Sequence, residues 1–136
     1  MSKIDITLTS DEQTILRKAA YGAVTLLSMT RPGPLASTRQ NMAGALALTG
    51  ATGMVGQVLA TKEKIVLKGT VAETAEQVLP ALSQAVAVLD AKAPAETVEF
   101  QRVVTTALQQ AADATHGPNA AQNDMIAKIT AALQKH

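Results

Sequence analysis

The chain has 136 residues, and its 12 basic and 11 acidic side chains leave a net charge of only +1. A chain of this length buries about two thirds of its unfolded surface on folding, so it does not need a disulfide or a metal to form a core. Cysteine is absent, and Tyr21 and Phe100 are the only tyrosine, tryptophan or phenylalanine residues. This composition excludes thiol chemistry and gives neither the positive field nor the aromatic platforms that nucleic-acid binding uses.

A first helix is predicted over residues 10–29. Ser10 and Gln13 have the spacing of a capping box, and the two acids between them suit the positive end of a helix dipole. Apolar residues then recur every three to four positions until little polar face remains, which predicts a central helix. The run Arg31-Pro32-Gly33-Pro34 ends this helix, because proline cannot donate to the helical hydrogen bonds.

A second helix is predicted over residues 34–48, with Met42 and Leu48 among its inward-facing positions, and a short third helix follows the glycines of residues 50–56. Residues 42–60 carry no charge and approach the length of a membrane span. They also contain four glycines, two threonines and a glutamine, which weaken transfer into hydrocarbon. We therefore expect a buried core segment and no membrane contact.

Two short segments suggest extended structure outside the helices. Residues 1–9 are predicted as an extended amino-terminal segment in which Ile4, Ile6 and Leu8 alternate with polar residues. The charged connector near residue 65 has a short β-branched run, and a minor two-stranded ribbon of residues 4–8 with residues 64–68 is one arrangement for these segments.

Three further helices are predicted in the carboxy-terminal half. Thr70 and Glu73 form a capping box at the start of the fourth helix, where Pro80 introduces a kink or marks the first turn of the main part. Pro94 stands early in the fifth helix, and Gly117-Pro118 ends it. Asn119 and Gln122 then cap a final helix whose apolar positions again follow the helical period.

The sequence thus predicts an all-α bundle of five to six helices in a single domain, residues 1–136. The motifs Gly33-Pro34 and Gly117-Pro118 are separated by 117 − 33 = 84 positions. With that offset the apolar stripe of the first helix falls on the stripe of the fifth. Two interpretations fit this match, a duplicated helix-loop-helix unit with pseudo-twofold packing, or two unrelated amphipathic helices that share a period.

The carboxy-terminal third resembles a known family. Residues 111–113, a short loop and the helix of residues 119–133 are similar to the helix pairs of TerB-like, tellurite-resistance-type domains. The resemblance lies mainly in residues 100–133 and extends faintly to residues 16–48. It implies a small helical domain associated with stress responses and, in some members, with divalent metals bound by acidic loop residues. The loop of residues 30–37 has no carboxylate, so the resemblance bears on the fold and not on metal binding there.

The string from Thr49 to Gly56 resembles the glycine fingerprint of short-chain dehydrogenase-like Rossmann domains, which makes Gly50, Gly53 and Gly56 candidate cofactor-binding residues. In that fold such glycines let a strand turn into a helix whose amides hold a pyrophosphate. Here the preceding residues are alanine-rich and helical, and Lys68 stands where an acid is expected. A glycine-rich helix junction packed closely on a neighbour is therefore the alternative.

Asp113, His116 and Asp124 gather around the last interhelical loop and are candidate ligands for a divalent metal, which accepts one imidazole and two carboxylates. The alternative is local: His116 stands near a helix end, and Asp124 lies in a first turn, where negative charge is favourable. No nucleophile elbow is present, and the paired carboxylates lie in opening turns of helices, so catalysis is not expected.

Two function classes remain. The first is a non-catalytic helical module that binds a protein partner or self-associates through an alanine- and glycine-rich face in residues 42–60. The second is a small-ligand, nucleotide or metal protein, or an enzyme, with its site near Gly50–Gly56 or His116. No export signal is recognised at the amino terminus, which with the absence of cysteine favours a cytoplasmic location.

Overall fold

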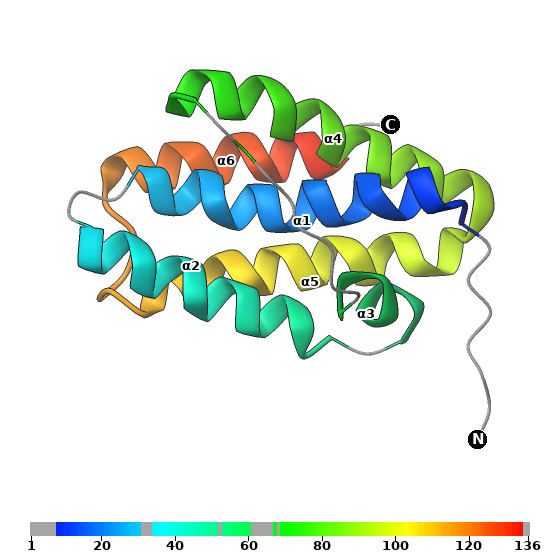
Figure 1. Ribbon diagram of the computed structural model, residues 1–136, viewed down its shortest axis with the longest axis horizontal. Coiled ribbons are helices and arrows are strands. Elements are labelled where there is room, and N and C mark those ends of the chain that lie inside the picture. Colours follow the sequence, from blue (N-terminus) through cyan, green and yellow to red (C-terminus); the bar gives the residue numbers. More distant parts are fainter. Residues whose placement is uncertain (1–7, 31–33, 52, 61–66, 68, 135–136) are drawn as a thin grey trace.

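The computed structural model describes residues 8–30, 34–51, 53–60, 67 and 69–134. None of these described residues is in a strand, and they form six helices. In chain order the helices are α1 (Ser10–Met29), α2 (Pro34–Thr49), α3 (Gly53–Ala60), α4 (Val71–Lys92), α5 (Pro94–Asp113) and α6 (Ala120–Gln134) (Figure 1). The predicted all-α bundle is confirmed.

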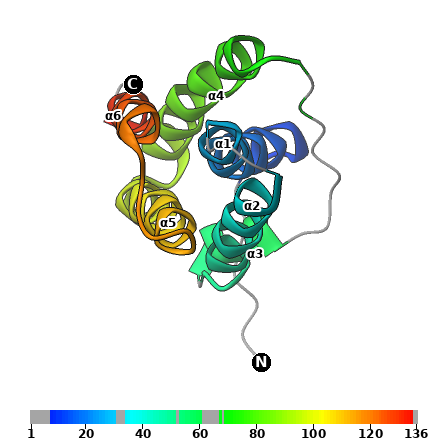
Figure 2. The ribbon, with the colours of Figure 1, turned by 90° about the vertical axis from the view of Figure 1, so that its left-hand side faces the viewer.

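Helix α1 is the central element, as its sequence predicts. It lies between α2, α4, α5 and α6 when the bundle is viewed from its end (Figure 2). Helix α4 is its main partner, while α2 packs chiefly on α5. The α1 side chains Ala19, Ala20 and Ala23 are fully buried, and such small residues let neighbouring helices come close.

The contact between α1 and α2 depends on one glycine. A Cβ atom at Gly44 would lie 2.5 Å from Cγ1 of Val24, which is closer than any normal contact. Gly44, Gln40 and Leu48 form the buried side of α2. Because these positions are four residues apart, they follow one side of the helix, and the opposite side of α2 faces outward.

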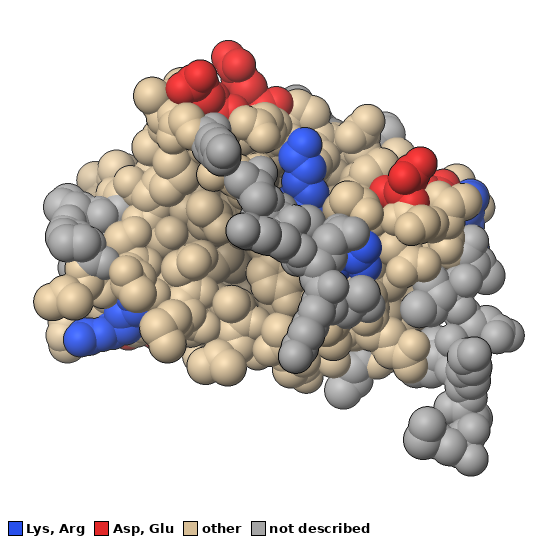
Figure 3. Space-filling model, viewed as in Figure 1, with Lys and Arg blue, Asp and Glu red and all other residues tan. Residues whose placement is uncertain are grey.

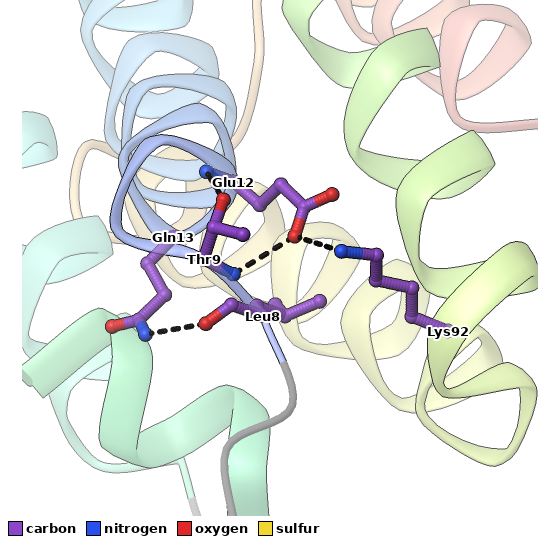
Figure 4. A network of polar contacts seen from close by, with 5 residues as sticks. All are labelled: Leu8, Thr9, Glu12, Gln13 and Lys92. Carbon is purple, nitrogen blue, oxygen red and sulfur yellow. Dashed lines mark hydrogen bonds and ion pairs between the residues drawn. The ribbon is translucent and has the colours of Figure 1, made fainter.

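The first helix is capped one residue earlier than predicted. The N-cap is Thr9, whose Oγ1 accepts from the amide of Glu12 at 3.2 Å, while Glu12 Oε1 accepts from the Thr9 amide at 2.8 Å. Gln13, the expected partner of Ser10, instead donates to the carbonyl of Leu8 (Figure 4). The prediction of a Ser10–Gln13 box was therefore wrong. Thr9–Glu12 and Ser10–Gln13 both have the spacing of the motif, and the protein uses the first of them.

A tertiary contact accompanies this choice of cap. Lys92, in the last turn of α4, donates to Glu12 Oε1 at 2.7 Å, so the same carboxylate caps α1 and ties it to α4 (Figure 4). The hydrogen bond from Lys92, together with that from the Thr9 amide, lowers the pKa of Glu12 below its ordinary value.

The boundary signals predicted at the starts of α4 and α5 are confirmed, while residues 31–33 of the predicted Arg31–Pro34 stop lie outside the described residues. Thr70 and Glu73 form the predicted capping box, and Pro94 is at the first position of α5. The hydrogen bond from the Thr70 amide lowers the pKa of Glu73. Pro80 lies inside α4 and does not begin it. None of the described helices has the length and hydropathy required to cross a bilayer.

The apparent duplication holds for helix positions but not for packing. Shifting α1 by 84 residues gives the bounds of α5, since 10 + 84 = 94 and 29 + 84 = 113. The stripe buried in α1 then matches the stripe buried in α5. The second helices differ, because α2 packs on both α1 and α5, whereas α6 packs mainly on α4. Two similar helices therefore occupy different surroundings, and the bundle is not pseudo-twofold.

The predicted ribbon lies almost entirely outside the described residues. Of residues 4–8 and 64–68, only Leu8 and Leu67 are described, and neither of these two is in a strand. Leu8 is buried in the hydrophobic core that the six helices share.

Candidate functional site

Helix α2 presents an apolar face to solvent. Leu35, Met42 and Leu46 are 80%, 62% and 71% exposed. At 3.6 residues per turn, these three positions lie within about 40° of one another around the helix. Thr38 and Arg39 lie between them in the sequence, and we call these five residues the α2 face. The expectation that Met42 faces the core was wrong, because Gln40, Gly44 and Leu48 are the residues that α2 buries.

The α2 face carries almost no charge. Arg39 is the only charged residue in α2, and α3 has none. In Figure 3 the surface over α2 is largely free of Lys, Arg, Asp and Glu, apart from a blue patch at one end. A partner for this face cannot be selected mainly by opposite charge.

A shallow hollow lies within the α2 face. Leu35, Thr38, Arg39 and Met42 line it, and its volume is about 340 Å³. Residues at positions i, i+3, i+4 and i+7 are the four that form a hole for one side chain of a facing helix in knobs-into-holes packing. The protruding side chain of Leu46 lies one turn beyond this hollow. The same face therefore carries both a knob and a hole.

A second groove separates α2 from α5 beside the α2 face. Its volume is about 480 Å³, and none of the described residues that line it is charged. Its lining residues are Ala43, Leu46, Ala47, Gly50, Thr106 and Gln110. The volume lies within the range of small-molecule sites, which usually span about 300–1,000 Å³.

The glycine string forms the junction between α2 and α3. Gly53 has a φ of 77°, a left-handed conformation that favours glycine. A Cβ atom at Gly56 would lie 2.2 Å from the carbonyl oxygen of Ala51, so only glycine lets α3 come this close to the preceding chain. Gly50 is exposed and ends α2 with a hydrogen bond to Leu46. Two of the three candidate cofactor-binding glycines thus have a structural explanation.

Side chains from α1 and α5 hold both ends of α3. The amide of Val55 donates to Glu96 Oε1 at 3.3 Å, which places a carboxylate at the positive end of the helix dipole. At the other end, Arg17 donates to the carbonyl of Val58 at 3.3 Å and Tyr21 donates to that of Leu59 at 2.6 Å. Burial raises the pKa of Tyr21 above its ordinary value. An internal anion thus lies where a Rossmann helix would receive a phosphate.

The candidate metal ligands do not converge. Asp113 accepts from Gln109 at 3.0 Å, and Asp124 pairs with Lys128 at 3.2 Å. His116 is exposed, and its backbone has a φ of 67° in the turn after α5. Within the described part of the chain, no group of three His, Asp or Glu side chains is arranged to hold a metal ion.

A buried amide pair links α2 to α6, and no local pattern in the sequence predicts it. Gln40 and Gln122 are both fully buried. Gln122 Nε2 donates to Gln40 Oε1 at 2.7 Å and to the carbonyl of Leu27 at 3.1 Å, while Gln40 Nε2 donates to Thr115 Oγ1 at 2.7 Å. Glutamine is usually a surface residue, so only the packing of α2 against its neighbours shows this role.

No protein-family model matches the chain, and no curated protein or solved structure shows significant similarity to it.

Proposed function

We propose that this protein is a non-catalytic helical module that acts by binding protein through the α2 face. Among the described residues, four large apolar side chains are mostly exposed, and three of them, Leu35, Met42 and Leu46, lie on this face. Exposed apolar surface costs about 25 cal/mol per Å² relative to buried surface. A cluster of such side chains along one helix is therefore typical of a binding surface, whereas single ones are ordinary.

The partner that fits the α2 face is an uncharged apolar side of another helix. Arg39 is the only charge on the face, so a strongly acidic or basic partner would gain little from it. The hollow between Leu35 and Met42 has the four-residue outline that receives one side chain of a facing helix. These two features support helix-on-helix docking over the binding of an extended or charged peptide.

Cross-linking in cells that produce the protein tests this function. A photoreactive amino acid in place of Leu46 should capture a defined protein, and the same residue in place of Val98 should not. Val98 is a matched control, because it is 70% exposed and lies on α5. Adding Met42→Asp should abolish capture from position 46, since a carboxylate would then be buried in an apolar interface. Equal capture from positions 46 and 98, or capture that survives Met42→Asp, would contradict the proposal.

Small-ligand binding is the second candidate, and the groove between α2 and α5 is the observation that favours it. The groove includes Gly50 and lies close to the junction at which the glycine string suggests a cofactor. A ligand present at 100 times its dissociation constant stabilises a protein by about 2.7 kcal/mol. Thermal unfolding with NAD(P), nucleotides and divalent metals distinguishes the two candidates, because a module that binds only protein should show no shift.

The resemblance to TerB-like domains adds a biological setting to this proposal. It favours a helical module that takes part in a stress response, and this setting stays a prediction. Comparing the in-cell cross-linking from position 46 before and after oxidative or metalloid stress would test it.

A further inference from the structure

We infer that the helix that occupies the α2 face is α2 of a second copy of this chain, packed antiparallel with Met42 near the twofold axis. This inference rests on the proposed function and names the partner of the same site. A closed twofold interface must be self-complementary, because each copy offers the same patch. The α2 face meets this condition, since it carries both the protruding Leu46 and the hollow between Leu35 and Met42.

The spacing of the knob and the hole sets the register. In an antiparallel pair centred on Met42, residues whose numbers sum to 84 lie at the same level. Leu46 of one copy is then level with Thr38 of the other, which lies in the middle of the hollow. The twofold axis repeats this contact, so each copy inserts one leucine and receives one. A parallel pair would instead place the two protruding Leu46 side chains, one from each copy, beside each other and away from the hollows.

Charge also favours the antiparallel arrangement. In a parallel pair the two Arg39 side chains would lie next to each other in an apolar interface. In the antiparallel pair, Arg39 is level with Ala45 of the second copy. The two Arg39 residues are then separated by six helical positions, or about 9 Å along the axis, which is close to the screening length in physiological salt. The face has no acid that could offset the repulsion in the parallel form.

The size of the face predicts a modest affinity. Stable interfaces bury about 800 Å² on each partner, and one pair of four-turn helices reaches only the lower part of the usual range. We therefore expect a dimer that forms at micromolar concentrations and dissociates on dilution. Sedimentation equilibrium of the full chain between about 1 and 300 µM should show this transition.

Aspartate substitutions at two residues of similar exposure, one on α2 and one on α5, test whether the α2 face forms the dimer interface. Leu46→Asp should weaken the dimer at least about tenfold, because it removes the knob and buries a charge. Val98→Asp should leave the association unchanged, since Val98 is equally exposed but lies on α5. Circular dichroism of both variants checks that the helices are retained. A chain that stays monomeric over the whole concentration range would overturn the inference, and so would equal association of the two variants.

Single cysteines test the register, because the natural chain has none. Under mild oxidation, Met42→Cys should form a disulfide-linked dimer. A mixture of Thr38→Cys and Leu46→Cys should give mainly the mixed dimer, and Val98→Cys should stay monomeric. Preferential linkage of Leu46→Cys to itself would refute the antiparallel register. If the purified chain is monomeric but position 46 still captures a different protein in cells, the inference fails and the proposed function stands.

Discussion

Replacing Gly56 by alanine separates the structural role of the glycine string from a binding role. In a helix interior alanine is favoured over glycine by up to about 1 kcal/mol, so intrinsic propensity predicts a more stable protein. Packing predicts the opposite. The new Cβ atom would lie 2.2 Å from the carbonyl oxygen of Ala51, well inside the 3.0 Å that Cβ atoms essentially never cross. Because the obstructing atom belongs to the backbone, α3 has to move.

The cost of that movement follows from what α3 contacts. Overpacking of a well-packed region costs about 1–3 kcal/mol, and weakening the hydrogen bond from Val55 to Glu96 adds about 1 kcal/mol. After the gain in propensity is subtracted, Gly56→Ala should lower the free energy of unfolding by about 1–3 kcal/mol. The midpoint of urea unfolding, followed by circular dichroism, measures this change.

Gly50→Ala is the matched control within the same string. A Cβ atom at Gly50 would lie 3.3 Å from the carbonyl oxygen of Leu46, which is far less crowded than at Gly56, so we expect a change of at most about 1 kcal/mol. An unchanged or higher urea midpoint for Gly56→Ala would refute the steric argument. A loss of ligand-induced stabilisation in either variant, without a loss of basal stability, would instead support the role in cofactor binding.

Three further predictions concern polar contacts and the helix backbone. Gln122→Ala should lower the free energy of unfolding in urea by about 2–4 kcal/mol. Because Gln122 and Gln40 are hydrogen-bonded to each other, the double variant with Gln40→Ala should lose less stability than the sum of the two single variants. Additive losses would contradict this coupling. Since hydrogen bonding to Lys92 lowers the pKa of Glu12, the stability that Glu12 contributes should be present above its ordinary value of 4.5 and lost as the pH falls through the lower, folded value. Melting temperatures between pH 6 and pH 3 should therefore fall less steeply in Glu12→Gln, and parallel curves would rule this out. Pro80→Ala should stabilise the protein by about 1–3 kcal/mol, since it restores a backbone donor inside α4. A lower melting temperature of this variant would contradict the prediction and show that packing requires the proline.

Local sequence signals predicted the helix positions well. Thr70 with Glu73 marked the start of α4, and Pro94 marked the start of α5. These signals work because a capping side chain and a missing amide proton act within one turn of the residue that carries them. At α1 the same logic missed by one residue. Thr9 and Ser10 both had a suitable partner three positions later, and the ion pair from Lys92 engages the earlier one.

The candidate sites were harder to read from the sequence. The sequence predicts both a buried core segment and an alanine- and glycine-rich association face within residues 42–60. Met54 and Leu59 are buried in the core, whereas Met42 and Leu46 in the same stretch, together with Leu35 before it, are exposed on α2. Helix α2 combines alanine, glycine and leucine on all sides, so its sequence does not show which side is buried.

Helical periodicity, capping residues and prolines act through neighbouring residues, so the order of amino acids alone predicts the class of fold and the position of nearly every helix. Three features are visible only in the folded protein: the side of α2 that is exposed, the position of Glu96 at the amide end of α3, and the contact of Gln40 with Gln122 in the core. The last two of these join residues that are 41 and 82 positions apart. Contacts at such separations depend on how the helices pack together, which no local pattern records.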